Sequence, residues 1–131
     1  MIKEKKWKQV DAIHYPDINR VGVCKPSEFK PEHVELRQNK IDKIIDILRY
    51  VKHSKAFQFD GSYCLKHLLE KHINYVSNGE FITACKQLGF DMKYDTNFQT
   101  PNCIFRFGEK QVLARIKQWL EENKTNNIQT N

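Results

Sequence analysis

Apolar residues recur at three- and four-residue steps in four stretches of the chain, and this spacing predicts four amphipathic helices. We expect the first helix at 31–53, because Pro31 suits a first helical position, where its missing N–H costs nothing. The apolar face of this helix carries Val34, Ile41, Ile44, Ile45, Leu48 and Val51.

The second predicted helix begins at Asp60 or Ser62, since either side chain is able to cap its N-terminus. Between the first two helices, residues 55–60 read as a short extended segment. We expect its phenylalanines, Phe57 and Phe59, to lie in the core. The apolar face of the second helix carries Tyr63, Leu65, Leu68, Leu69 and Ile73.

A capping box marks the start of the third predicted helix. The Ser77 hydroxyl is placed to accept from the N–H of Glu80, and the Glu80 carboxylate reaches back to Ser77. Gly89 follows the helix, and we predict a positive φ there, because the chain must turn sharply into a strand. The stripe expected to be buried comprises Phe81, Ala84, Cys85 and Leu88.

Beyond Gly89 the hydrophobic period changes from helical to alternating, which predicts a β-hairpin. Its strands are 90–95 and 103–107, and residues 96–102 form the loop. One face buries Phe90, Met92, Tyr94, Cys103, Phe105 and Phe107. The other face, turned to solvent, carries Asp91, Lys93, Asp95, Ile104 and Arg106. A final helix at 109–123 turns its apolar side inward, with Val112, Ile116, Trp119 and Leu120.

The two ends of the chain have the weakest patterns. Residues 10–15 and 19–24 have the character of short strands, so the N-terminal segment 1–30 forms either a hairpin or an extended arm. We expect it to pack on a single domain made of residues 31–123. The polar residues 124–131 lack apolar anchors, and we predict a disordered tail there.

The predicted fold class is α+β, with a helix-rich core, a β-hairpin and a C-terminal amphipathic helix. Residues 38–107 place helix, helix, tight turn, helix, glycine and hairpin in an order that resembles a winged helix-turn-helix. Three segments carry this resemblance: GSYCLKHLLEKH, YVSNGEFITACKQLGF and PNCIFRF. They are also similar to segments of small, mostly uncharacterised proteins of phages, plasmids and prophages. The resemblance implies a mobile-element setting and names no activity.

The composition of the chain predicts a single hydrophobic core and an anionic partner. The 131 residues, 40% of them apolar, suffice to fill one hydrophobic core. The first residues lack the apolar run of a signal peptide and no stretch is apolar enough for a membrane helix, so we expect a cytoplasmic protein. The formal net charge of +6 favours an anionic partner. Positive charge is dense in residues 1–8 and 37–55, whereas residues 61–107 are close to neutral.

The leading hypothesis is a non-enzymatic DNA-binding accessory or regulatory protein of a mobile element. In the winged-helix geometry, residues 78–88 form the recognition helix that enters the major groove of double-stranded DNA. The wing, the basic first helix and the N-terminal arm then supply phosphate contacts. The expected DNA- or partner-binding side chains are Thr83, Lys86, Gln87, Lys93, Phe98, Arg106, Lys40 and Lys43, with the arm lysines Lys3, Lys5, Lys6 and Lys8.

The alternative hypothesis is a protein-binding inhibitor or adaptor that uses the same fold to block a host nucleic-acid-binding machine. The near-neutral recognition helix and the bulky loop residues Phe98 and Pro101 favour it. The two hypotheses differ in surface charge: a continuous positive band across residues 78–88 and the wing favours DNA, and a broken band favours a protein. Both leave self-association into a homodimer open.

We assign no catalytic, metal or cofactor site from the sequence. Cys64 and His67 share a helix face, but two ligands do not make a metal site. Tyr63, Lys66, His67 and Glu70 cluster within about one helical turn, and we interpret them as a polar helix face, because no phosphate loop or nucleophile elbow accompanies them. The cysteines form no CxxC pair and read as reduced, mostly buried packing residues: Cys24, Cys64, Cys85 and Cys103.

Overall fold

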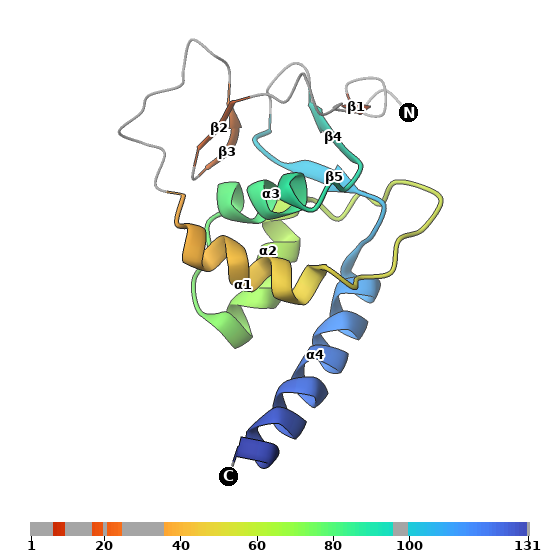
Figure 1. Cartoon of the computed structure of the whole chain (residues 1–131). Coiled ribbons are helices and arrows are strands. Elements are labelled where there is room, and N and C mark those ends of the chain that lie inside the picture. Colours follow the sequence, from red (N-terminus) through yellow and green to blue (C-terminus); the bar gives the residue numbers. More distant parts are fainter. Residues whose placement is uncertain (1–6, 10–16, 20, 25–35, 96–99, 131) are drawn as a thin grey trace.

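The computed structural model describes residues 7–9, 17–19, 21–24, 36–95 and 100–130. The fold is α+β, as predicted, with helices α1, α2 and α3 gathered beside a small sheet and α4 extending away from them to the C-terminus (Figure 1). Four expected site residues lie outside the described ranges: Lys3, Lys5, Lys6 and Phe98. The elements are β1 (Trp7–Gln9), β2 (Asp17–Asn19), β3 (Gly22–Cys24), α1 (Gln38–Leu48), α2 (Ser62–Ile73), α3 (Asn78–Gln87), β4 (Met92–Asp95), β5 (Cys103–Phe105) and α4 (Glu109–Thr130).

Strand β4 is the centre of a three-stranded antiparallel sheet with the order β1-β4-β5. The predicted β4–β5 hairpin is confirmed, with Met92 paired to Phe105. Strand β1 pairs with the other edge of β4, so Lys8 belongs to a strand and not to an extended arm. On the outer side of β5, Gln58 forms an isolated bridge to Phe105, and its N–H donates to the Phe105 carbonyl at 2.7 Å. This bridge joins the segment before α2 to the sheet.

A second hairpin, β2–β3, packs on α3 and forms a separate two-stranded sheet. Of the two N-terminal strands predicted, residues 10–15 lie outside the described chain, and the second is confined to Gly22–Cys24. Its partner is Asp17–Asn19, most of which lies between the two predicted strands. The N–H of Val23 donates to the Pro101 carbonyl at 2.9 Å. The predicted strand boundaries are wrong here, because pairing with β3 and contacts with α3, which is distant in the chain, hold Asp17–Asn19 extended.

Helix α1 ends earlier than predicted, at Leu48 instead of His53. The N–H of Val51 donates to the Leu48 carbonyl at 3.0 Å and closes a turn that leads the chain toward the sheet. The predicted start at Pro31 lies outside the described residues, and the backbone of Arg37, just before α1, is extended. The buried residues of α1 are Ile41, Ile44, Ile47 and Leu48.

The predicted N-terminal caps of α2 are wrong. Gly61 occupies the capping position, and no side chain caps the helix. Asp60 instead accepts from the N–H of Glu109 at 2.9 Å, at the start of α4. Ser62 accepts from the N–H of Cys103 at 3.0 Å, beside β5. Both side chains therefore tie α2 to elements far away in the sequence.

The predicted boundaries of α3 are confirmed. The Ser77 hydroxyl accepts from the N–H of Glu80 at 3.1 Å, and Glu80 Oε1 accepts from the N–H of Ser77 at 2.8 Å. The helix ends at Gln87, and Gly89 has a φ of 74°. A side chain other than glycine rarely adopts this left-handed conformation, so Gly89 directs the chain into β4.

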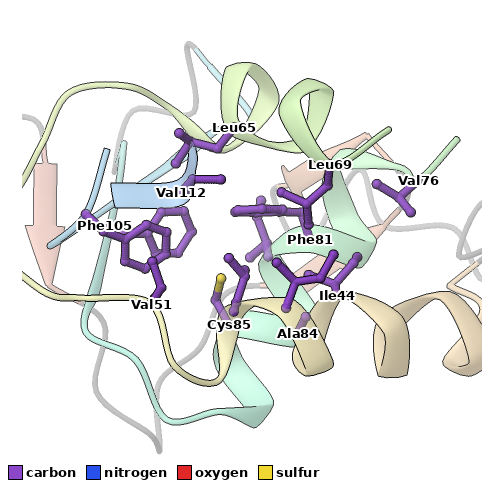
Figure 2. Packing of buried hydrophobic residues seen from close by; sticks show 14 of the residues in the cluster. Ile44, Val51, Leu65, Leu69, Val76, Phe81, Ala84, Cys85, Phe105 and Val112 are labelled. Atoms are coloured by element: carbon purple, nitrogen blue, oxygen red, sulfur yellow. The ribbon is translucent and has the colours of Figure 1, made fainter. Parts of the chain in front are cut away.

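Apolar side chains from the helices and the sheet meet in one core. The stacked rings of Phe105 and Phe107 have centroids 5.1 Å apart. Cys85 and Cys103 are buried, as predicted, and burial raises the pKa of the Cys103 thiol to about 12, so it packs as an uncharged group. The side chain of Cys24 lies outside the described residues. Figure 2 shows the packing of Ile44, Val51, Leu65, Leu69, Val76, Phe81, Ala84, Cys85, Phe105 and Val112.

Several side chains depart from the predicted burial. Tyr63 and Phe59, expected in the core, are 51% and 55% exposed, and Cys64 is also exposed. Ile104 and Asp95, expected to face solvent, are buried. An alternating pattern predicts the face of a strand to which a residue belongs. It does not reveal whether another segment covers that face.

Helix α4 continues to Thr130, so residues 124–130 are helical where a disordered tail was predicted. No glycine or proline follows Gly108, so nothing in the sequence stops the helix. The buried Arg115 fixes α4 to the body of the fold, because its Nε donates to the Ile47 carbonyl at 2.6 Å. Leu120, expected to face inward, is 42% exposed.

Candidate binding site

The N-terminal end of α3, the expected recognition helix, is covered. Asn78, Gly79 and Glu80 are buried, and both α1 and the β2–β3 hairpin pack on this helix. The Asn78 amide nitrogen donates to the Val21 carbonyl at 2.8 Å and to the Asn102 side chain at 3.0 Å. Recognition helices contact base edges with their N-terminal residues. In this chain, other segments of the protein cover that end of α3.

Glu80 stabilises the fold and does not face a groove. Its side chain is 0% exposed, and Arg37 Nε lies 2.8 Å from Glu80 Oε2. Burial raises the pKa of Glu80, but hydrogen bonds from Arg37 and Ser77 and the Arg37 charge outweigh burial and hold that pKa below its ordinary value of 4.5. Sequence reasoning missed this ion pair, because no local pattern links Arg37 to α3.

The remaining site residues of α3 lie toward its C-terminal end. Lys86 and Gln87 are exposed, whereas Thr83 is half-buried. The Gln87 side chain accepts a hydrogen bond from Gln38 of α1 at 3.2 Å. The surface left for reading a DNA groove is therefore short and includes one lysine.

The two α1 lysines expected to bind phosphate differ in role. Lys40 is half-buried, and its Nζ donates to the Ile73 carbonyl at 2.8 Å, so this ammonium group joins α1 to the end of α2. Lys43 is exposed on the same helix. The exposed carboxylates of Asp42 and Asp46 also lie on α1. The exposed surface of α1 therefore carries charges of both signs.

Lys93 and Arg106 come together from the two hairpin strands, but over an aromatic ring. The Lys93 Nζ and the Arg106 Cζ lie 4.5 Å and 4.4 Å from the centroid of the Phe57 ring. Arg106 also pairs with Asp91, at 2.9 Å between Nε and Oδ2. Phe57, predicted to be a core residue, is half-buried beneath these two cations.

A hollow of about 470 Å³ opens beside the covered end of α3. Val21, Tyr63 and Tyr75 at this hollow are 58%, 51% and 59% exposed. The three segments that carry the sequence resemblance all contribute to it, from α2, from the connection into α3 and from the approach to β5. Its lining consists of Val21, Tyr63, Lys66, His67, Glu70, Tyr75, Asn78 and Pro101.

Charged groups in the hollow compensate one another. The Lys66 side chain is 4% exposed, and its Nζ lies 2.9 Å from Glu70 Oε1. The same Nζ lies 5.0 Å from the ring centroids of both Tyr63 and Tyr75. His67 Nδ1 lies 2.6 Å from Glu70 Oε1. The prediction of a polar helix face is therefore incomplete, because Tyr75, outside the helix, completes the cluster.

The hollow combines aromatic walls with a small number of polar groups, a combination typical of binding pockets. Among the residues that the structure describes, one buried polar atom of a lining residue, Asn78 Oδ1, finds no hydrogen-bond partner. Within the described parts of the chain, no group of three or more His, Cys, Asp and Glu side chains is arranged to hold a metal ion. The arrangement is suited to recognition of an apolar or aromatic group.

No protein-family model, curated protein or solved structure matches this chain. Across the described residues, no helix has both the length and the apolar character required to cross a membrane.

Proposed function

We propose that this chain is a non-enzymatic protein-binding module, an inhibitor or adaptor built on a winged-helix scaffold. Its contact surface is the hollow between Tyr63 and Tyr75. One observation carries the proposal: these two rings and Val21 are each more than half exposed around a hollow whose charged groups are already paired.

The order of the elements supports the winged-helix scaffold. Helix α1 is followed by the Gln58 bridge, and Gln58 pairs with the last strand of the hairpin, β5. Helices α2 and α3 come next, and β4 and β5 complete the sheet. This is the order of helix, strand, helix, helix and two-stranded wing. Strand β1 and the β2–β3 hairpin are additions to that order, and the second addition covers α3.

The chemistry of the hollow favours a protein partner. Tyrosine offers a large apolar ring and a polar hydroxyl, and it is enriched among residues that dominate protein interfaces. Unpaired charges are depleted at the centre of such interfaces. Lys66 fits this rule, because it is almost fully buried and paired with Glu70. A phosphate backbone requires available cations instead.

The segments that cover the N-terminal end of α3 are an argument against the reading of duplex DNA by this helix. The hairpin and Asn102 close the end of α3 that a recognition helix would present, and Glu80 and Arg37 neutralise each other beside it. Beside α3 and the hairpin, Arg37 is paired with Glu80 and Arg106 with Asp91, and by the criterion of surface charge this pairing favours a protein. We propose that the partner belongs to a host nucleoprotein machine, in line with the resemblance of three segments of the sequence to proteins of mobile elements.

Site-specific photo-crosslinking tests the proposal. The photoreactive residue p-benzoylphenylalanine replaces Tyr75 in the full chain, which is then irradiated in a lysate of the cells that carry the gene. We expect a discrete protein adduct that resists nuclease and is lost when Tyr63→Ala is added, because both rings border one hollow. The control carries the probe at Leu113 on α4, which is 47% exposed. Identical adducts from both positions, or adducts that vanish with nuclease, contradict the proposal.

A further inference from the structure

A second cluster, of aromatic and basic side chains, lies at the edge of the sheet beside β5 and is separate from the hollow. Phe57 and Phe59 flank Gln58, which pairs with β5, and residues two apart in an extended segment point to the same side. Lys93 and Arg106 reach the Phe57 ring on that side, at 4.5 Å and 4.4 Å from its centroid. We call Phe57, Phe59, Lys55, Lys93 and Arg106 the basic-aromatic face.

One ring of this face is open to solvent. Phe59 is 55% exposed, although its apolar character predicts a core position. Arg106 is held in place, because its guanidinium donates to the Lys55 carbonyl and its backbone carbonyl accepts from Ser54. An exposed ring beside cations that are already positioned loses little side-chain entropy when a flat ligand stacks on it.

The local charge is positive. Lys52 and Lys55 are exposed on the segment that leads to Phe57. Of the nearby carboxylates, Asp91 is paired with Arg106, whereas Asp60 keeps its negative charge and accepts from a backbone N–H at the start of α4, so Lys52 and Lys55 outnumber it. The lysines therefore set the charge that an approaching ligand meets along this segment.

We infer that the basic-aromatic face binds single-stranded nucleic acid. Cations along a surface track the phosphates, and exposed aromatic rings take unstacked bases, which is how sequence-tolerant single-strand binding is built. Phe59 supplies such a ring, and Lys55 of this face, together with Lys52 on the segment that leads to it, supplies the phosphate contacts. A duplex keeps its bases stacked and leaves an exposed ring without a partner. This inference does not depend on a protein bound in the hollow.

Fluorescence anisotropy with the full chain and a labelled oligothymidylate of about 12 nucleotides, within the usual site sizes, tests the inference. We expect binding that weakens with salt, with a log-log slope of about −0.7 for each phosphate neutralised. Phe59→Ala should weaken binding about 5- to 150-fold and leave the slope unchanged, because one stacking contact is lost. The ring is more than half exposed, so this variant keeps its fold.

Variants that remove charge separate the contribution of phosphate contacts from that of base stacking. Lys52→Gln with Lys55→Gln should flatten the salt slope, because fewer counterions are released. The matched control is Lys117→Gln with Lys124→Gln, which removes the same charge from exposed positions of α4. Equal effects of the two pairs, unchanged affinity in Phe59→Ala, or tighter binding of a duplex of the same length overturns the inference. Wild-type affinity weaker than about 100 μM at physiological salt, below ordinary non-specific binding, also overturns it.

Discussion

Glu80 connects two helices through one carboxylate. It closes the capping box of α3 with Ser77, and it accepts from both the backbone N–H and the side chain of Arg37, just before α1. A buried carboxylate is costly unless its oxygens are satisfied, and here the hydrogen bonds and the Arg37 charge keep it ionised. The residue that a recognition helix would present to DNA is thus committed to the fold.

Glu80→Gln isolates the charge of this carboxylate, since glutamine also serves in a capping box. We expect the free energy of unfolding to fall by about 1–2 kcal/mol at neutral pH, toward the low end for charged hydrogen bonds because the Arg37 side chain is 46% exposed. The folded pKa of Glu80 lies below 4.5, so its contribution is present above that pH and disappears as the pH falls through the folded value.

Urea unfolding of the wild type and Glu80→Gln at about pH 6 and at steps below pH 4.5 measures this contribution. The difference in the free energy of unfolding between the two proteins should be largest at the higher pH and should decrease on acidification. A difference that stays constant across this range contradicts the assigned ionisation.

At the scale of elements, the boundaries that were predicted correctly are those set by nearby residues. Ser77, Glu80 and Gly89 define α3 within one short segment, and alternation predicts the hairpin that follows. The failures depend on distant groups. Asp60 and Ser62 resemble helix caps, but they bind backbone N–H groups of α4 and β5. No local pattern carries that information.

Gly89→Ala tests the turn from α3 into β4. An added Cβ meets nothing within 4 Å, so the cost arises from the backbone alone. We expect a loss of about 1–2 kcal/mol in the free energy of unfolding, because the φ of 74° is left-handed and unfavourable for alanine. Gly89→Asn should lose less, since asparagine tolerates this conformation. Denaturant unfolding compares the three proteins, and equal stability of all three would show that the turn is not left-handed in solution.

Local sequence patterns likewise predict only part of the candidate site. The polar cluster of α2 is visible in the sequence, because its members are close along one helix. Val21, Tyr75 and Pro101, which complete the hollow, come from other segments and share no periodicity with that cluster. Phe59 has the composition of a core residue, and only its place at the outer edge of the sheet leaves it exposed.

For the whole molecule, the β2–β3 hairpin changes which surface is available. The hairpin packs on α3, and the Val21 carbonyl accepts from Asn78 in the first turn of that helix. With the cover in place, Val21 and Pro101 border the hollow beside Tyr63 and Tyr75. The same hairpin therefore closes the N-terminal end of α3 and borders the aromatic hollow, which is the surface where we propose that a partner binds.

The most direct test of this binding surface is to purify the crosslinked partner and to measure its affinity for the wild type and for variants by calorimetry. Tyr63→Ala and Tyr75→Ala should each weaken binding by about 30-fold or more, as interface tyrosines at hot spots do. Lys86→Ala and Gln87→Ala, at the open end of α3, should change it less than about 3-fold, the typical result for peripheral contacts. All four side chains are exposed, so the variants keep their fold. The reverse pattern, with loss at Lys86 and Gln87 and none at the tyrosines, contradicts the account.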